Sequence, residues 1–219
     1  MLGYELIDDV AILTMDDGKA NAVGHAYIDA LTEGLDRAEK EAKAVVILGR
    51  PGVFSAGFDL KEIGKGAAES QALVNRGAGL LYRLFTLPLP VVTASAGHAI
   101  AAGALLLLAA DTRFGVAGDA KYGLNETAIG MTLPPFGLQM ALCRLSKRHQ
   151  TEAVIQAKLY DGDGALAVGY LDHVVAPEAL HQAAVDKAAE LAQLPGSAYA
   201  AMKLAARKEY IDIIAASLQ

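Results

Sequence analysis

The chain has 219 residues, 53% of them hydrophobic, which is enough for one large domain with a filled core. Its formal net charge of −6, with basic residues scattered along the chain, argues against nucleic acid as the main partner. The single cysteine, Cys143, excludes an internal disulfide and every cysteine-rich metal site. The first ten residues lack the basic start and long apolar run of a signal peptide, so we expect a cytoplasmic protein.

The first part of the chain is predicted to alternate strands and helices, which indicates an α/β core. Strands are expected at 4–7, 10–15, 44–49, 91–96 and 112–117. Helices are expected at 25–41, 76–87 and 103–110, of which the first has apolar residues at helical spacing and a charged opposite face. Residues 84–110 carry no formal charge, but Pro88, Pro90 and Gly97 divide them into a strand, a loop and a helix, so we expect no membrane span there.

The pattern becomes mainly helical from residue 135 onward. Helices are predicted at 136–145, 148–157, 178–193 and 197–214. The last two carry apolar residues, among them Leu191, Leu194, Met202 and Leu204, that a monomer of this size would cover poorly. These helices are therefore expected to fold back on the core or to pack on another subunit.

Two segments have the same plan, in which small residues lead from a strand into the start of a helix. In "VFSAGFDLKEI" (53–63) the small residues are Ser55, Ala56 and Gly57, and in "GHAIAAGALLLLAA" (97–110) they are residues 101–104. The first N–H groups of a helix have no partner within it. Taken singly, such a loop usually reflects tight packing. Together, two N–H donors can converge on one carbonyl oxygen and stabilise the enolate that forms when the neighbouring carbon loses a proton.

These segments resemble a known family. "VFSAGFDLKEI", "GHAIAAGALLLLAADTRF", "YGLNETAIGMTLPPF" and "AVGYLDHVV" occur in the order and approximate spacing of the crotonase (enoyl-CoA hydratase/isomerase) family. The resemblance covers nearly the whole chain. It implies an α/β fold with a ββα superhelix at 1–160 as the catalytic core and a C-terminal helical segment at 161–219 that assembles trimers or hexamers. It also implies an acyl-CoA thioester as the partner, with coenzyme A as part of the substrate and no separate cofactor.

The same resemblance implies the residues of the site. The oxyanion donors fall on the backbone N–H groups of Phe58 and Ala102. The other substrate-binding positions fall on Ala56, Gly57, Asp59, Leu60, Gly103, Leu105 and Asn125. Asp59 is expected to place its backbone beside the nucleotide part of coenzyme A.

Two carboxylate positions separate the reactions of this family. Its hydratases use two glutamates around one water, and those positions fall on Leu105 and Glu126 here. Leucine cannot accept a proton, so the two-carboxylate arrangement is incomplete. The phrase "GLNET" most resembles the mitochondrial-type Δ3,Δ2-enoyl-CoA isomerase branch, whose 1,3 proton shift needs one base. The apolar neighbours of Glu126 should disfavour its charged form and make it a stronger base.

Other interpretations stay open at this stage. Asn125 could cap a helix whose first turn holds Glu126. A group outside these motifs could replace the missing glutamate and give a hydratase or another crotonase reaction, or the chain could be a non-catalytic acyl-CoA-binding or assembly subunit. The five histidines show no metal-ligand spacing, and no G-x-S-x-G elbow is present, so neither a metal site nor a hydrolase is expected.

Overall fold

The structure, a computed structural model, describes residues 2–218. The strands are β1 Leu2–Ile7, β2 Val10–Met15, β3 Ala44–Leu48, β4 Gly52–Ser55, β5 Val91–Ser95, β6 Gly97–Ile100, β7 Thr112–Val116, β8 Tyr122–Gly123 and β9 His173–Val175. The helices are α1 His25–Glu41, α2 Leu60–Ile63, α3 Ala67–Thr86, α4 Ala102–Ala109, α5 Pro135–Arg144, α6 Gly162–Val168, α7 Leu180–Ala192, α8 Gly196–Ala206 and α9 Lys208–Ser217. Short 3-10 turns occur at η1 Thr127–Ile129 and η3 Pro177–Ala179, and η2 Thr151–Ile155 is a π-helical turn.

Two sheets organise the chain. The larger has the strand order β1-β2-β3-β5-β7-β9, parallel except for the antiparallel β1–β2 pair, and the smaller is parallel with the order β4-β6-β8. Successive turns of the chain add a strand to the large sheet and then one to the small sheet, and two of them go directly into helices, α2 and α4. The predicted α/β core of ββα turns is therefore confirmed.

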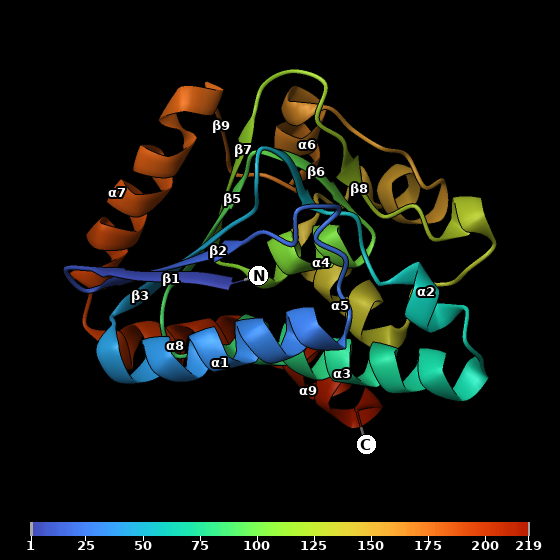
Figure 1. The fold of residues 1–219 in the computed structure, drawn as a ribbon, viewed down its shortest axis with the longest axis horizontal. Helices are drawn as coiled ribbons and strands as arrows, with labels where there is room; N and C mark the ends of the chain where they lie inside the picture. Colours follow the sequence, from blue (N-terminus) through green and yellow to red (C-terminus); the bar gives the residue numbers. More distant parts are fainter. Residues whose placement is uncertain (1, 219) are drawn as a thin grey trace.

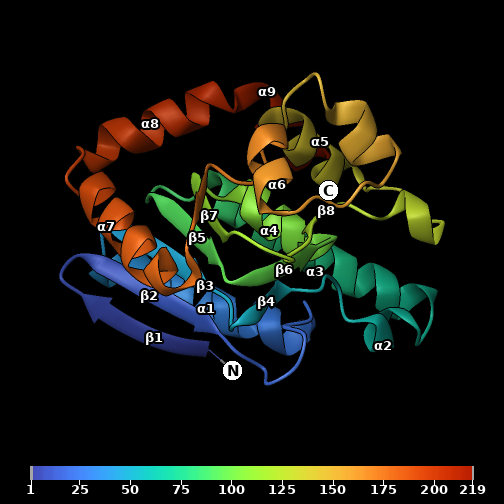
Figure 2. The ribbon, with the colours of Figure 1, turned by 90° about the horizontal axis from the view of Figure 1, so that it is seen from above.

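Helices cover the large sheet on both sides. In Figure 1, α1 and α3 lie along one side of the molecule and α7 lies on the other. Every residue of β3 is buried, as expected for a parallel strand covered on both faces. From α7 the chain continues through α8 and α9 in an arc that returns to α5 (Figure 2).

The centre of the fold is α4, all of whose residues are buried. It contacts α3, α5 and both of the small-sheet strands that precede helices, β4 and β6. No helix within residues 2–218 combines the length and the apolar character needed to cross a membrane. The uncharged stretch 84–110 is instead divided among the end of α3, β5, β6 and α4.

Several predicted bounds were wrong. Helix α3 begins at Ala67, nine residues earlier than predicted, and the segment Gly97–Ile100 is strand β6 where we expected a loop. Strand β9 and helix α6 were not predicted, and only the short turn η2 occupies the region of the helix expected at 148–157. The helix expected at 197–214 is broken at Arg207 into α8 and α9.

The C-terminal segment is part of the same packed body. Within 161–219, β9 pairs with β7, and α7 packs on the large sheet. The role of this segment in assembly stays a prediction.

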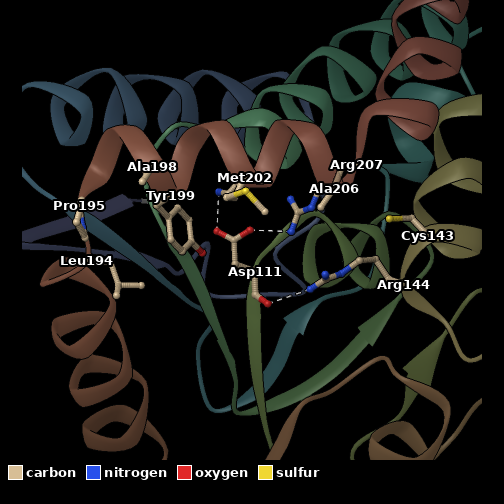
Figure 3. Close-up of a pocket in the computed structure, with 11 residues that line it drawn as sticks. Asp111, Cys143, Arg144, Leu194, Pro195, Ala198, Tyr199, Met202, Ala206 and Arg207 are labelled. Carbon is tan, nitrogen blue, oxygen red and sulfur yellow. Dashed lines mark hydrogen bonds and ion pairs between the residues drawn. The ribbon is translucent and has the colours of Figure 1, made fainter.

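A buried ionic cluster fixes α8 to the core. The Asp111 carboxylate accepts from Lys203 Nζ at 2.6 Å and from Arg207 at 2.7 Å, and these two cations also donate to carbonyl oxygens at the end of α3 and just after it. Figure 3 shows Arg207 and Arg144 approaching Asp111. These residues are part of the lining of a cavity of about 690 Å³. Because Lys203 and Arg207 are already paired with carbonyls and Asp111, we interpret this cluster as a structural anchor.

Candidate active site

The two small-residue loops meet in space. A methyl group on Gly57 would come within 3.0 Å of the Ala101 methyl and 3.5 Å of the Ala102 backbone nitrogen, and Gly57 itself has a left-handed φ of 97°. A methyl group on Gly103 would lie 2.2 Å from the Ser55 carbonyl oxygen, closer than atoms can approach. Both glycines are therefore required by the contact between the loops, and they bring the starts of α2 and α4 together.

The backbone around these glycines leaves two N–H groups available. Phe58 forms a parallel bridge with Val23, in which Val23 donates to the Gly57 carbonyl at 2.8 Å and Asp59 donates to Val23 at 3.2 Å. This pairing directs the Phe58 N–H away from Val23. Ala102 is the first residue of α4, so its N–H has no acceptor within the helix. The predicted donors thus lie on two adjoining loops.

Ala101 holds the second loop in a strained conformation. Its φ is 53°, and a positive φ is energetically unfavourable for any residue that has a side chain. The Ala101 N–H donates to the Gly123 carbonyl at 2.9 Å. Strained residues of this kind collect at functional sites. Here the unusual backbone conformation of Ala101 lets the chain pass from β6 directly into α4.

Glu126 lies immediately before the 3-10 turn η1 and is partly buried. Its Oε2 atom is buried and has no hydrogen-bond partner within the described part of the chain, and burial raises the pKa of its carboxyl above the ordinary value. The side chain of the neighbouring Asn125 does not cap the turn, and its Oδ1 is also buried without a partner among residues 2–218. The alternative in which Asn125 caps a helix is therefore wrong.

One cavity of about 390 Å³ brings these groups together. Of the predicted site residues, it is lined by Ala56, Phe58, Leu60, Leu105, Asn125 and Glu126. Gly57, Ala102 and Gly103 are not among the lining residues and lie in the contact between the two loops. Leu105 is only 2% exposed, whereas Leu60 at the mouth is 73% exposed. The cavity thus has the buried apolar side chain of Leu105 in its wall and the exposed apolar side chain of Leu60 in its lining.

The side chain of Asp59 does not line this cavity. It accepts from the Lys61 N–H at 2.8 Å, which caps α2, and it faces a separate cavity beside the start of α1. Asp59 is thus the capping residue at the start of α2, and the expectation for its backbone beside the nucleotide part of coenzyme A stays a prediction.

Sequence reasoning missed one wall of the cavity. Ser70, Gln71 and Val74 line it from the first half of α3, and Ile129 and Met131 close its rim. The first turns of α3 carry polar residues on the cavity side, so their pattern gave little helical signal. The spacing of Leu73, Gly77 and Leu80 was the available clue.

Comparison with known proteins places the chain among acyl-CoA enzymes. A sequence model described as enoyl-CoA hydratase/isomerase matches residues 6–218. A probable enoyl-CoA hydratase of Mycobacterium avium is 34% identical over 205 residues, covering 89% of this chain and 76% of the relative.

Two solved structures have the same fold. An enoyl-CoA hydratase/isomerase family protein from Pseudomonas syringae is 42% identical, with a TM-score of 0.96 over 99% of this chain and 94% of that chain. Human mitochondrial delta3-delta2-enoyl-CoA isomerase is 27% identical, with a TM-score of 0.94 over 98% of this chain and 86% of that chain.

Proposed function

The chain belongs to the enoyl-CoA hydratase/isomerase family, and from this premise we propose that it is a Δ3,Δ2-enoyl-CoA isomerase with Glu126 as its acid-base. The observation that carries the proposal is the composition of the cavity, in which Glu126 is the one carboxylate among the described lining residues and Leu105 occupies the position of the first hydratase glutamate. A double-bond shift needs one group that takes and returns a proton, whereas the family's addition of water uses two carboxylates.

In the proposed reaction, the thioester oxygen accepts hydrogen bonds from the N–H groups of Phe58 and Ala102. These donors stabilise the negative charge that develops on that oxygen when Glu126 removes a proton from C2 of a 3-enoyl-CoA. The electrons of the broken C2–H bond form the enolate, and the double bond moves to C2–C3 as Glu126 returns the proton to C4. Substrate and product therefore have the same atoms, and Glu126 ends as it began.

The surroundings of Glu126 suit this role. Burial raises the pKa of its carboxyl, so the ionised form present at neutral pH is a stronger base than an exposed glutamate. The apolar side chain of Leu105 offers no group to hold a water for attack on C3. The proton carried by Glu126 is then more readily returned to the substrate than exchanged with solvent.

One observation favours hydration as a second candidate function. Asn125 lines the same cavity, and its Oδ1 atom is buried and has no partner within residues 2–218. Together with Glu126 it offers two acceptors, which one water could bridge. The relative from Mycobacterium avium is also named a hydratase. A third possibility is a chain that binds acyl-CoA without turning it over.

Purified protein given a 3-enoyl-CoA and, separately, a 2-enoyl-CoA distinguishes these functions. The proposal expects rapid formation of the conjugated 2-enoyl product from the first and slow hydration of the second. Rapid formation of 3-hydroxyacyl-CoA from the 2-enoyl substrate, with no double-bond shift, would show that the protein is a hydratase and contradict the isomerase proposal. Binding without either product would support the non-catalytic possibility.

We also propose that the protein forms trimers or hexamers. Helix α8 carries exposed apolar residues, among them Met202 at 67% and Leu204 at 44% exposure, and Leu194 just before it is 49% exposed. An apolar surface of this kind is commonly covered by another subunit. Light scattering at micromolar concentration tests this, because a clean monomer would contradict it.

A further inference from the structure

The ring of Phe58 lies against α3 at a position without a side chain. A methyl group on Gly77 would be 2.4 Å from Phe58 Cε1 and 2.7 Å from Cζ, distances that real Cβ atoms do not show. Gly77 is buried and sits within α3, where glycine is unfavourable for the helix itself. Its presence there is explained by the ring that occupies the space of its missing side chain.

A second glycine of the same helix provides the contrast. Gly79 is exposed, and a methyl group on it would meet no atom within 4 Å. Only Gly77 is therefore in contact with the site. The two positions differ by two residues and lie on different faces of α3.

Gly77 continues the face of α3 that forms the cavity wall. Ser70 and Val74 line the cavity at seven and three residues before it, the spacing that places helix residues on one face. Phe58, whose ring occupies the space beside Gly77, is itself one of the residues that line the same cavity. A ring displaced from Gly77 would thus move along this wall or into the cavity.

We propose that Gly77 is a positioning residue that sets how long an acyl chain the cavity accepts, by holding the Phe58 ring back against α3. The inference rests on the proposed function, since it treats the cavity as the acyl-binding space. The reacting part of the substrate lies at the backbone donors and Glu126, which the ring movement leaves in place. The tail extends along the α3 wall past Val74, where the ring would intrude.

The test replaces Gly77 by alanine and compares it with Gly79→Ala as the matched control. Calorimetry with saturated hexanoyl-CoA and dodecanoyl-CoA measures binding without turnover, and kcat and KM are measured with 3-hexenoyl-CoA and 3-dodecenoyl-CoA. Gly77→Ala should weaken binding of the longer chain by at least roughly tenfold, the effect of misfitting a methylene or more in an apolar pocket. The shorter chain and the Gly79→Ala protein should be affected little.

A rescue experiment separates this role from a general structural one. In a Phe58→Ala background the ring is absent while the backbone N–H remains, so adding Gly77→Ala should no longer change the preference for chain length. Equal losses for both chain lengths, a loss that persists in the double variant, or no change in preference would each overturn the proposal.

A second variant and a measurement on the wild type test the proposal when Gly77→Ala gives no answer. If Gly77→Ala does not fold, Phe58→Leu tests the same contact by making the ring side chain smaller. Its smaller side chain should shift the preference toward dodecanoyl-CoA, and an unchanged preference would overturn the proposal. A wild type that binds acyl-CoA but does not isomerise contradicts the proposed function alone, because the binding readout for Gly77 remains.

Discussion

Replacing Glu126 by glutamine tests the base and its burial in one variant. Glutamine keeps the size and the hydrogen-bonding capacity of the side chain but cannot take a proton at neutral pH. If Glu126 shuttles the proton, turnover of 3-enoyl-CoA should fall by about 10²–10⁴-fold, the usual effect of losing a general base. Affinity for acyl-CoA should change little, because the backbone donors of Phe58 and Ala102 remain.

The same variant should be more stable than the wild type at neutral pH. The carboxylate of Glu126 is partly buried, and its Oε2 has no partner within the described residues. An unpaired buried atom costs about 1–3 kcal/mol when neutral and more when charged, and glutamine removes the charge. Taking the lower end because the residue is not fully buried, we expect the free energy of unfolding to rise by about 1 kcal/mol and Tm by about 2–4 °C.

The sign of the pH dependence follows from the raised pKa of Glu126. Burial favours the protonated form in the folded state, so the wild type loses stability as pH rises from the ordinary carboxylate pKa through the raised one. The advantage of Glu126→Gln should therefore be present at pH 7 and vanish in acid. Thermal unfolding across this pH range measures it, with exposed Glu178→Gln as the control. Wild-type turnover in Glu126→Gln, or lower stability at pH 7, would refute the reasoning.

Three other substitutions test separate parts of the site and its scaffold. Leu105→Glu buries a carboxylate and should lower the free energy of unfolding by several kcal/mol unless the carboxylate finds water. If the variant folds, it should hydrate 2-enoyl-CoA. A folded variant that adds no water would mean that the pocket differs from that of a hydratase at more than this residue. Ala101→Gly relieves a residue at φ 53° and should stabilise the fold by about 1 kcal/mol in denaturant titrations, whereas destabilisation would argue against strain at this position. Asp111→Asn leaves buried Lys203 and Arg207 without their carboxylate and should destabilise the protein by about 3–5 kcal/mol, and an unchanged Tm would contradict the anchoring role.

The elements that could be predicted from the sequence are those with a strong local pattern. Helix α1 begins and ends where its amphipathic spacing predicts, and β2 is a continuous run of largely apolar residues. Strand β6 could not be found in this way, because its four residues, two of them glycine and histidine, are strand only through pairing with β4 and β8. The first half of α3 was missed because its cavity face carries polar residues such as Ser70 and Gln71.

The site was predictable in its residue types and less so in its geometry. Glu126 stood out as a carboxylate among apolar residues, and the family resemblance supplied the assignment of donors to two distant loops. No local pattern gives the contact between Gly57 and Ala101 or the left-handed φ of an alanine. The packing of the Phe58 ring on Gly77 is likewise a tertiary contact, and no pattern in the sequence indicates that these two segments meet.

The central claim, a single-carboxylate proton shift, is tested most directly by NMR of the purified protein with a 3-enoyl-CoA in deuterated water. A proton shuttle by Glu126 should convert it to the 2-enoyl-CoA, with part of the original C2 proton recovered at C4 because Glu126 carries it there. Only slow formation of 3-hydroxyacyl-CoA is expected when the 2-enoyl-CoA is supplied. Binding of the substrate with no exchange or transfer of the C2 proton would contradict the account.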